Sequence, residues 1–203
     1  MENFLKLDRM FWQWVVGILL LIWVIFSGSK LSDFQGVFNV IGLLLLSIGL
    51  LGRLYATLYI GGMKNTGNDG NSFVCDGIYR VCRNPLYFFS FVALLGLLSL
   101  KGQILLLIIG GVGFLLIYRF TILGEEKYLS QKFGESYQQF LKDTPRFFPD
   151  FSKFKYEDKL EIRLFYLHKE LKSVLIWVIA AIFIYAVSIL QILDVIPIFI
   201  YSY

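Results

Sequence analysis

The sequence predicts an all-α protein, a polytopic membrane helical bundle with about five transmembrane helices. Hydrophobic residues make up 57% of the 203 residues and charged residues 17%, whereas soluble domains carry about 25% charged residues. The apolar residues are gathered in five segments of 15 to 24 residues, and a helix needs roughly 20 residues to cross a bilayer. Lysine and arginine fall almost entirely into alternate connections between these segments. These observations indicate one integral membrane domain over residues 1–203.

The predicted spans are separated by short polar connections. They are Met10–Phe26, Val37–Ile60, Leu86–Leu100, Gln103–Leu123 and a C-terminal transmembrane helix at about 174–193. Ser27–Gln35 is expected to be a turn, and Gly61–Asp76, rich in glycine and asparagine, a loop. Because only two residues join the third and fourth spans, these two should form an antiparallel hairpin. Gly110, Gly111 and Gly113 should give the fourth span a thin face for close packing.

The one long polar region, Gly124–Lys172, begins as a predicted helix. Glutamates and apolar residues recur there at helical spacing: Glu125, Glu126, Leu129, Phe133, Tyr137 and Phe140. The stretch Pro145–Pro149, with a proline at each end, should end that helix.

The distribution of basic residues predicts the orientation of the chain. The N-terminus carries two, the connection after the second span three, and the region after the fourth span ten. These fifteen fall on one side, and only Lys30 and Lys101 fall on the other. Because cytoplasmic loops are rich in lysine and arginine, the connection after the second span and the region after the fourth span should both face the cytosol. A bacterial inner membrane is the expected location.

Several classes of function are excluded or disfavoured by composition. The net charge of +4 is too small to indicate a nucleic-acid partner. Two cysteines, Cys75 and Cys82, and one histidine, His168, exclude a Cys/His zinc cluster and a histidine-based triad. We therefore expect no metal, and we expect membrane lipid as a partner.

The stretch Gly77–Phe89 is the first candidate site. Asn84 precedes Pro85, which favours the first turn of a helix, so that Asn84 should cap that helix and leave N–H groups that attract an anion. Arg83 stands directly before them. The alternative is an ordinary capped helix at the membrane interface, with Arg83 extended towards lipid headgroups.

The pair Glu125–Glu126 is the second candidate site. Adjacent residues on a helix point in different directions, so one glutamate can face inward while the other meets water or a neighbouring arginine. The alternative is a solvated first turn, in which acids complement the helix dipole. Charged groups this close to a bilayer are costly and mark functional sites by default.

Taken together, these motifs resemble a known family. The pattern G-x-Y-R-x-x-R-N-P-x-Y, a helical hairpin, E-E-x-x-L-x-x-x-F-G-x-x-Y and then P-R-F is similar to the isoprenylcysteine carboxyl methyltransferase and phospholipid methyltransferase superfamily. These are membrane enzymes that use S-adenosylmethionine. The resemblance covers a motif-bearing core of residues 53–149. It departs at Asn84, where the family usually has histidine, and at Phe89, where it has a small residue.

The resemblance implies a cytosolic cofactor pocket and a methyl acceptor that is lipophilic or small: a carboxylate, a thiol or an amine. It implies cofactor contacts from Tyr79, Arg83, Asn84, Pro85, Tyr87, Glu125 and Glu126, and catalytic roles for Arg53, Glu126 and Arg146. Arg83 would pair with the cofactor carboxylate, the tyrosines would flank its sulfonium or adenine, and Arg53 or Arg146 would orient a carboxylate acceptor. Two other functions stay open, an NADPH-dependent membrane reductase of the sterol reductase type and a non-enzymatic membrane scaffold.

Overall fold

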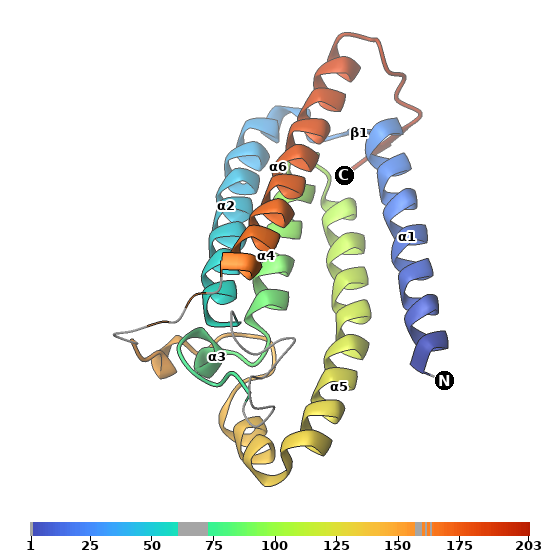
Figure 1. The fold of residues 1–203 in the computed structure, drawn as a ribbon. Helices are drawn as coiled ribbons and strands as arrows, with labels where there is room; N and C mark the ends of the chain where they lie inside the picture. The colour runs from blue at the N-terminus through green and yellow to red at the C-terminus, as the bar shows by residue number, and fades with distance from the viewer. Residues whose placement is uncertain (1, 61–72, 157–159, 161, 163) are drawn as a thin grey trace.

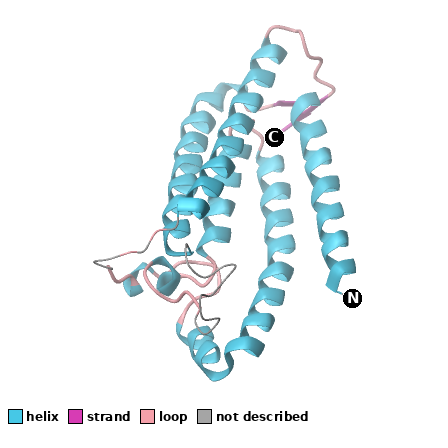
Figure 2. Cartoon of the chain, in the orientation of Figure 1, coloured by secondary structure: helices cyan, strands magenta, loops and turns pink. Residues whose placement is uncertain are grey.

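The structure is a computed structural model that describes residues 2–60, 73–156, 160, 162 and 164–203, with side chains from residue 14 onward. It is a bundle of long helices, seen in Figures 1 and 2: α1 (Glu2–Phe26), α2 (Gln35–Ile60), α4 (Pro85–Ser99), α5 (Ile104–Asp143) and α6 (Leu164–Ile192). Short elements connect them: β1 (Ser27–Ser29), η1 (Ser32–Phe34), α3 (Ile78–Val81), η2 (Phe151–Lys153) and β2 (Ile200–Ser202).

The helices are those of a multi-pass integral membrane protein. Three are long and apolar enough to cross a bilayer: α2 with the preceding turn, α5 and α6. Two further apolar helices are shorter, namely α4 and the part of α1 from residue 14 to residue 26. Their outward side chains are apolar, for example Leu51 at 66% and Ile176 at 67% exposure. Such surface is stable only when lipid covers it. The all-α membrane fold predicted from the sequence is confirmed.

Several boundaries differ from the predicted ones. The first helix starts at Glu2 and the last at Leu164, ten residues before the predicted 174. The fourth span does not end at Leu123 but continues as α5 to Asp143, which confirms the helix predicted for the start of the polar region. Gly134 has φ 58° and ψ −132°, so the chain bends there; only glycine adopts this backbone at low cost. Of the predicted loop Gly61–Asp76, residues 61–72 lie outside the described residues.

The closest helix contact is between α2 and α4. A Cβ atom added at Gly49 would lie 2.4 Å from the backbone nitrogen of Ala93, and one added at Gly96 would lie 2.3 Å from the nitrogen of Leu46. Because Gly49 and Gly96 have no side chain, the backbones of α2 and α4 can come this close. On α5, a Cβ atom added at Gly110 would lie 2.3 Å from Leu98, but one added at Gly113 would meet no described atom beyond its own helix backbone within 4 Å. The predicted thin face is therefore wrong at Gly113.

A polar network closes the far end of the bundle, away from the site described below. The parallel strands β1 and β2 pair there, which the sequence did not predict. Gln103 is fully buried and accepts a hydrogen bond from the Trp23 indole at 2.8 Å, while Lys101 donates to Gln191 at 2.7 Å. These bonds satisfy polar groups that would otherwise be costly to bury, and they fix the hairpin of α4 and α5 to α1 and α6.

We expect Gly49→Ala to destabilise the protein, because its methyl group overlaps the Ala93 backbone and overpacking of this kind costs about 1–3 kcal/mol. Thermal unfolding of the purified protein in detergent measures the loss. The matched control is Gly113→Ala, which meets open space and should unfold at the parent temperature or slightly above it. Equal unfolding temperatures for the two variants would contradict the close contact.

Candidate functional site

Three stretches that are far apart in the sequence meet at the end of the bundle where α2 ends. They are residues 79–87 at the start of α4, Glu125–Glu126 in α5, and Pro145–Asp150 beyond α5. Pro85 occupies the first turn of α4, as predicted. The bend at Gly134 and the end of α5 at Asp143 return the chain towards α3, so that the third stretch can contact the first (Figure 1).

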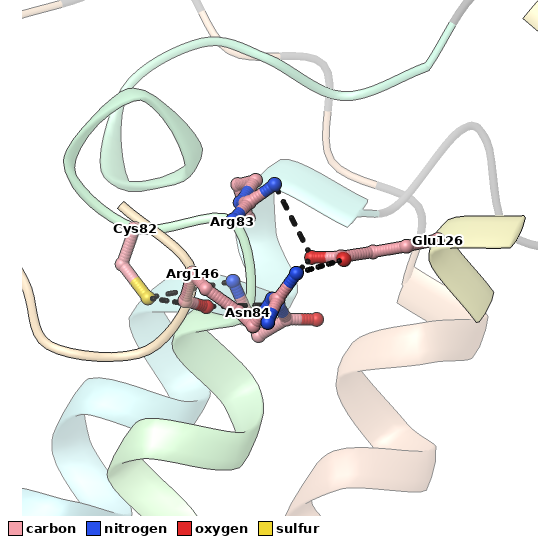
Figure 3. A network of polar contacts seen from close by, with 5 residues as sticks. All are labelled: Cys82, Arg83, Asn84, Glu126 and Arg146. Atoms are coloured by element: carbon pink, nitrogen blue, oxygen red, sulfur yellow. Dashed lines mark hydrogen bonds and ion pairs between the residues drawn. The ribbon is translucent and has the colours of Figure 1, made fainter. Parts of the chain in front are cut away.

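The Glu126 carboxylate lies between two arginines (Figure 3). Its Oε1 is 3.3 Å from Nη1 of Arg83, and both of its oxygens contact Arg146, at 3.2 Å from Nε and 3.0 Å from Nη2. The side chains of Glu126 and Arg83 are each only 9% exposed, whereas that of Arg146 is 50% exposed. A buried carboxylate needs such partners, since an unpaired charge is expensive to bury. With two cations and one anion, the cluster carries one excess positive charge.

The adjacent Glu125 points elsewhere and is exposed. It accepts a hydrogen bond from the Tyr87 hydroxyl at 2.7 Å. The Tyr87 ring lies 4.8 Å from that of Tyr118, which is stacked at 4.0 Å on Phe114. The inward glutamate is therefore Glu126. Glu125 lies at the end of a row of three aromatic rings, Phe114, Tyr118 and Tyr87, between α4 and α5.

The third stretch is fixed to the first by main-chain and side-chain bonds. The Arg83 N–H donates to the carbonyl of Pro145 at 2.9 Å, and that of Asp150 donates to Val81 at 3.0 Å. Asn84 begins α4, but its side chain makes no capping bond; its Nδ2 donates instead to the Arg146 carbonyl at 2.9 Å. The expected side-chain cap is thus wrong, and the amide holds the backbone that carries Arg146.

Cys82 lies in the same junction and is fully buried. Its thiol donates to the carbonyl of Phe147 at 3.1 Å. Burial raises the pKa of Cys82 to about 11, against smaller lowering effects of the Asn84 N–H and Arg83. The thiol is therefore protonated at neutral pH, and it is a poor nucleophile and a poor metal ligand in this state.

Two buried polar atoms at the site have no hydrogen-bond partner among the described residues: the Tyr79 hydroxyl and the Nε of Arg83. Tyr79 belongs to α3, and burial, followed by the charges of Cys82, Tyr87 and Glu125, raises its pKa well above the ordinary value. Tyr79 is therefore a neutral hydroxyl. Unpaired buried polar groups are rare in folded proteins, and a bound polar ligand would satisfy them.

Arg53 lies in a different cluster, within the bundle. Its Nε donates to Glu170 at 2.8 Å, and its guanidinium also contacts Ser90 and, at 3.4 Å, Ser173. The ion pair joins α2 to α6 with both side chains largely buried. Sequence reasoning missed Glu170, because the last span was expected to begin at 174. The helical spacing of Glu170 and Ser173, three residues apart at the start of the apolar run, is the signal that could have found it.

Comparison with known proteins finds a family match and relatives that are named for metal resistance. The profile of the phospholipid methyltransferase family matches residues 37–136. The chain is 33% identical to the nickel-cobalt-cadmium resistance protein NccN of Alcaligenes xylosoxydans xylosoxydans over 160 residues, 77% of this chain and 72% of that protein. It is 30% identical to the cobalt-zinc-cadmium resistance protein CzcN of Cupriavidus metallidurans over 159 residues, 77% and 71% of the two chains. No solved structure shows significant similarity.

We expect Asn84→Asp to weaken the junction and Asn84→His to retain it in part. An ionised aspartate cannot donate to the Arg146 carbonyl and would repel it, whereas a histidine ring nitrogen can donate. Because this hydrogen bond is exposed, we expect its loss to cost about 0.5–1.5 kcal/mol. Thermal unfolding of both variants and of Asn84→Ser measures the difference. If the Asp and Ser variants unfold at the parent temperature, the Asn84 amide does not hold this stretch.

Proposed function

The chain belongs to the phospholipid methyltransferase family, and from this premise we propose that it transfers a methyl group from S-adenosylmethionine to a lipophilic or small acceptor at the membrane face. The observation that carries the proposal is the Arg83–Glu126–Arg146 cluster, with its excess positive charge and its half-exposed Arg146. The amino acid end of the cofactor carries a carboxylate, which such a cluster can bind as a second anion.

The residues of the chain suit distinct parts of this task. Arg146 offers the exposed cation, while Glu126, with both oxygens engaged, holds Arg146 and Arg83 in place. The unpaired Tyr79 hydroxyl and Arg83 Nε would take polar groups of the cofactor. Tyr87, tied to Glu125, presents a ring face to which a cation is attracted. Asn84 and Pro85 fix the loop and the start of α4.

When bound, S-adenosylmethionine would supply an electrophilic methyl group on a sulfonium. Displacement at that methyl needs alignment and exclusion of water more than acid–base groups. A carboxylate or thiolate acceptor needs no base, and an amine acceptor must lose a proton, for which the exposed Glu125 is the available carboxylate. We propose that Arg53 acts with Glu170 to orient the acceptor within the bundle, where a lipophilic molecule would arrive from the bilayer.

We further propose that all five apolar helices cross the membrane, with the site on the cytosolic side. The fifteen basic residues on one side support this orientation. At 15 residues α4 is short, about 22 Å at 1.5 Å per residue. Its contacts with α2, α5 and α6 support a position inside the protein, where a short helix does not need to match the bilayer thickness.

We expect Arg83→Ala and Glu126→Ala each to weaken S-adenosylmethionine binding by on the order of 1.5–3 kcal/mol, the value of a charged hydrogen bond. Calorimetric titration of the purified variants measures the affinity. Arg80→Ala is the matched control and should bind like the parent, because Arg80 pairs with Asp76 and not with Glu126, and its side chain is 38% exposed. Unchanged affinity in both site variants would remove the cluster from the cofactor site.

The three candidate functions can be distinguished by which ligand raises the unfolding temperature of the protein. Stabilisation by S-adenosylhomocysteine supports the methyltransferase, stabilisation by NADPH instead would indicate a reductase, and neither would favour a scaffold. Incorporation of labelled methyl into lipid, peptide and small-thiol fractions then identifies the acceptor. Because the relatives are named for resistance to nickel, cobalt, zinc and cadmium, growth in these metals with the parent or the Arg83→Ala chain tests whether methyl transfer contributes to resistance.

For the orientation, we expect a membrane-impermeant thiol reagent to label Cys75 only after the cells are opened. Cys75 is partly exposed, whereas Cys82 is fully buried and should stay unlabelled in the folded protein. Cys75→Ser removes the signal and is the control. Labelling of Cys75 in intact cells would reverse the proposed orientation.

A further inference from the structure

Four aromatic side chains project outward within the stretch Phe148–Tyr156. Phe148 is 70% exposed, Phe151 62%, Phe154 39% and Tyr156 79%. The stretch lies outside the apolar spans, and it contains the short turn η2. So dense a group of exposed rings is unusual for a surface in contact with water only.

A basic groove lies beside this stretch. It has a volume of about 640 Å³ and is lined by four cations, Arg80, Lys142, Lys153 and Lys155, and by one acidic side chain, Asp143. Lys153 is held in place by the Asp143 carbonyl at 2.5 Å and by Asp150 at 3.7 Å. Arg80 pairs with the exposed Asp76 at 3.4 Å. When Asp76 and Asp150 are counted with Asp143, four cations face three carboxylates, so the groove has one positive charge in excess and is suited to an anion.

The position of both features is at the membrane boundary. Tyr156 precedes the start of α6 at Leu164 by eight residues, a distance of at most about 28 Å even for extended chain. In Figure 1, α3 and the orange turn η2 lie just beyond the end of α2, at the end of the bundle where α6 begins. Leu164 and Phe165 at that start are 65% and 71% exposed, as expected for side chains in contact with lipid.

We propose that Phe148–Tyr156 and the adjoining basic groove form a docking surface for anionic phospholipids of the leaflet at this end of the bundle. Tyrosine favours the headgroup level of a bilayer, and phenylalanine in interfacial segments enters the boundary between headgroups and acyl chains. Lysines next to a membrane are attracted to anionic lipid. The alternation of Phe151, Lys153, Phe154 and Lys155 places both kinds of group in one short stretch. The groove cations bind the phosphodiester while the rings enter the interface.

This surface is distinct from the Glu126 cluster but is connected to it. Asp150, within this stretch, donates its N–H to Val81, and Pro145, three residues before the stretch, accepts from the Arg83 N–H. Arg146 of the cluster lies between these two anchors. Arg80 and Arg83, three residues apart, belong to the groove and to the cluster respectively. Lipid docking therefore restrains the segment that completes the candidate site.

Hydrogen exchange of the full chain in nanodiscs tests the proposal. We expect peptides from 148–156 to exchange severalfold more slowly in discs of phosphatidylcholine with phosphatidylglycerol than in phosphatidylcholine alone, with the difference reduced at high salt. The double variant Lys142→Gln/Lys155→Gln should lose this difference. Lys127→Gln/Lys132→Gln, with the same change in charge on exposed positions of α5, should keep it.

The aromatic contribution has its own control. Phe151→Ser/Tyr156→Ser should exchange faster than the parent in both kinds of disc, whereas Tyr128→Ser, also 60% exposed but on α5, should not change exchange in 148–156. Equal exchange of the parent in neutral and anionic discs would overturn the proposal. So would protection by inorganic phosphate in neutral discs, which would identify a site for a free anion.

Discussion

The fixed point of this structure is the buried carboxylate of Glu126 between Arg83 and Arg146. Removing a charge from water is costly, and the cost is offset only when opposite charges with good geometry surround it. The pairing therefore requires three distant stretches of chain to be in place together. It also leaves one cation of the cluster in excess and half-exposed, which is the property that makes the cluster receptive to an anionic ligand.

That arrangement depends on a rigid scaffold within the apolar part of the bundle. Gly49 and Gly96 allow α2 and α4 to approach at backbone distance, and the Arg53–Glu170 pair joins α2 to α6. Because α4 begins directly after Asn84, the position of Arg83 is set by the packing of α4 against its neighbours. A site built on helix ends in this way is held more precisely than one carried by loops alone.

Arg80 and Arg83, three residues apart, belong to two cationic regions with different surroundings. Arg83 is buried and paired within the cluster, whereas Arg80, in the short helix α3, lines a groove near exposed aromatic rings. The chain beyond α5 contributes to both regions, through Arg146 to the first and through Lys153 to the second. A lipid bound at the groove can therefore affect the geometry of the Glu126 cluster, although the two regions share no ligand.

The sequence by itself determined the membrane class, the approximate positions of the apolar helices, the helix at the start of the polar region and the grouping of Arg83 with the glutamates. Hydropathy, periodicity and costly charges are local signals. Only the tertiary structure decided that Glu126 rather than Glu125 turns inward, that Asn84 holds the Arg146 backbone instead of capping its helix, and that Arg53 pairs with Glu170. These outcomes depend on how the chain bends at Gly134 and how α6 packs on α2. Such long-range geometry has no signature in a single sequence, because many partners of the right charge are available to each arginine.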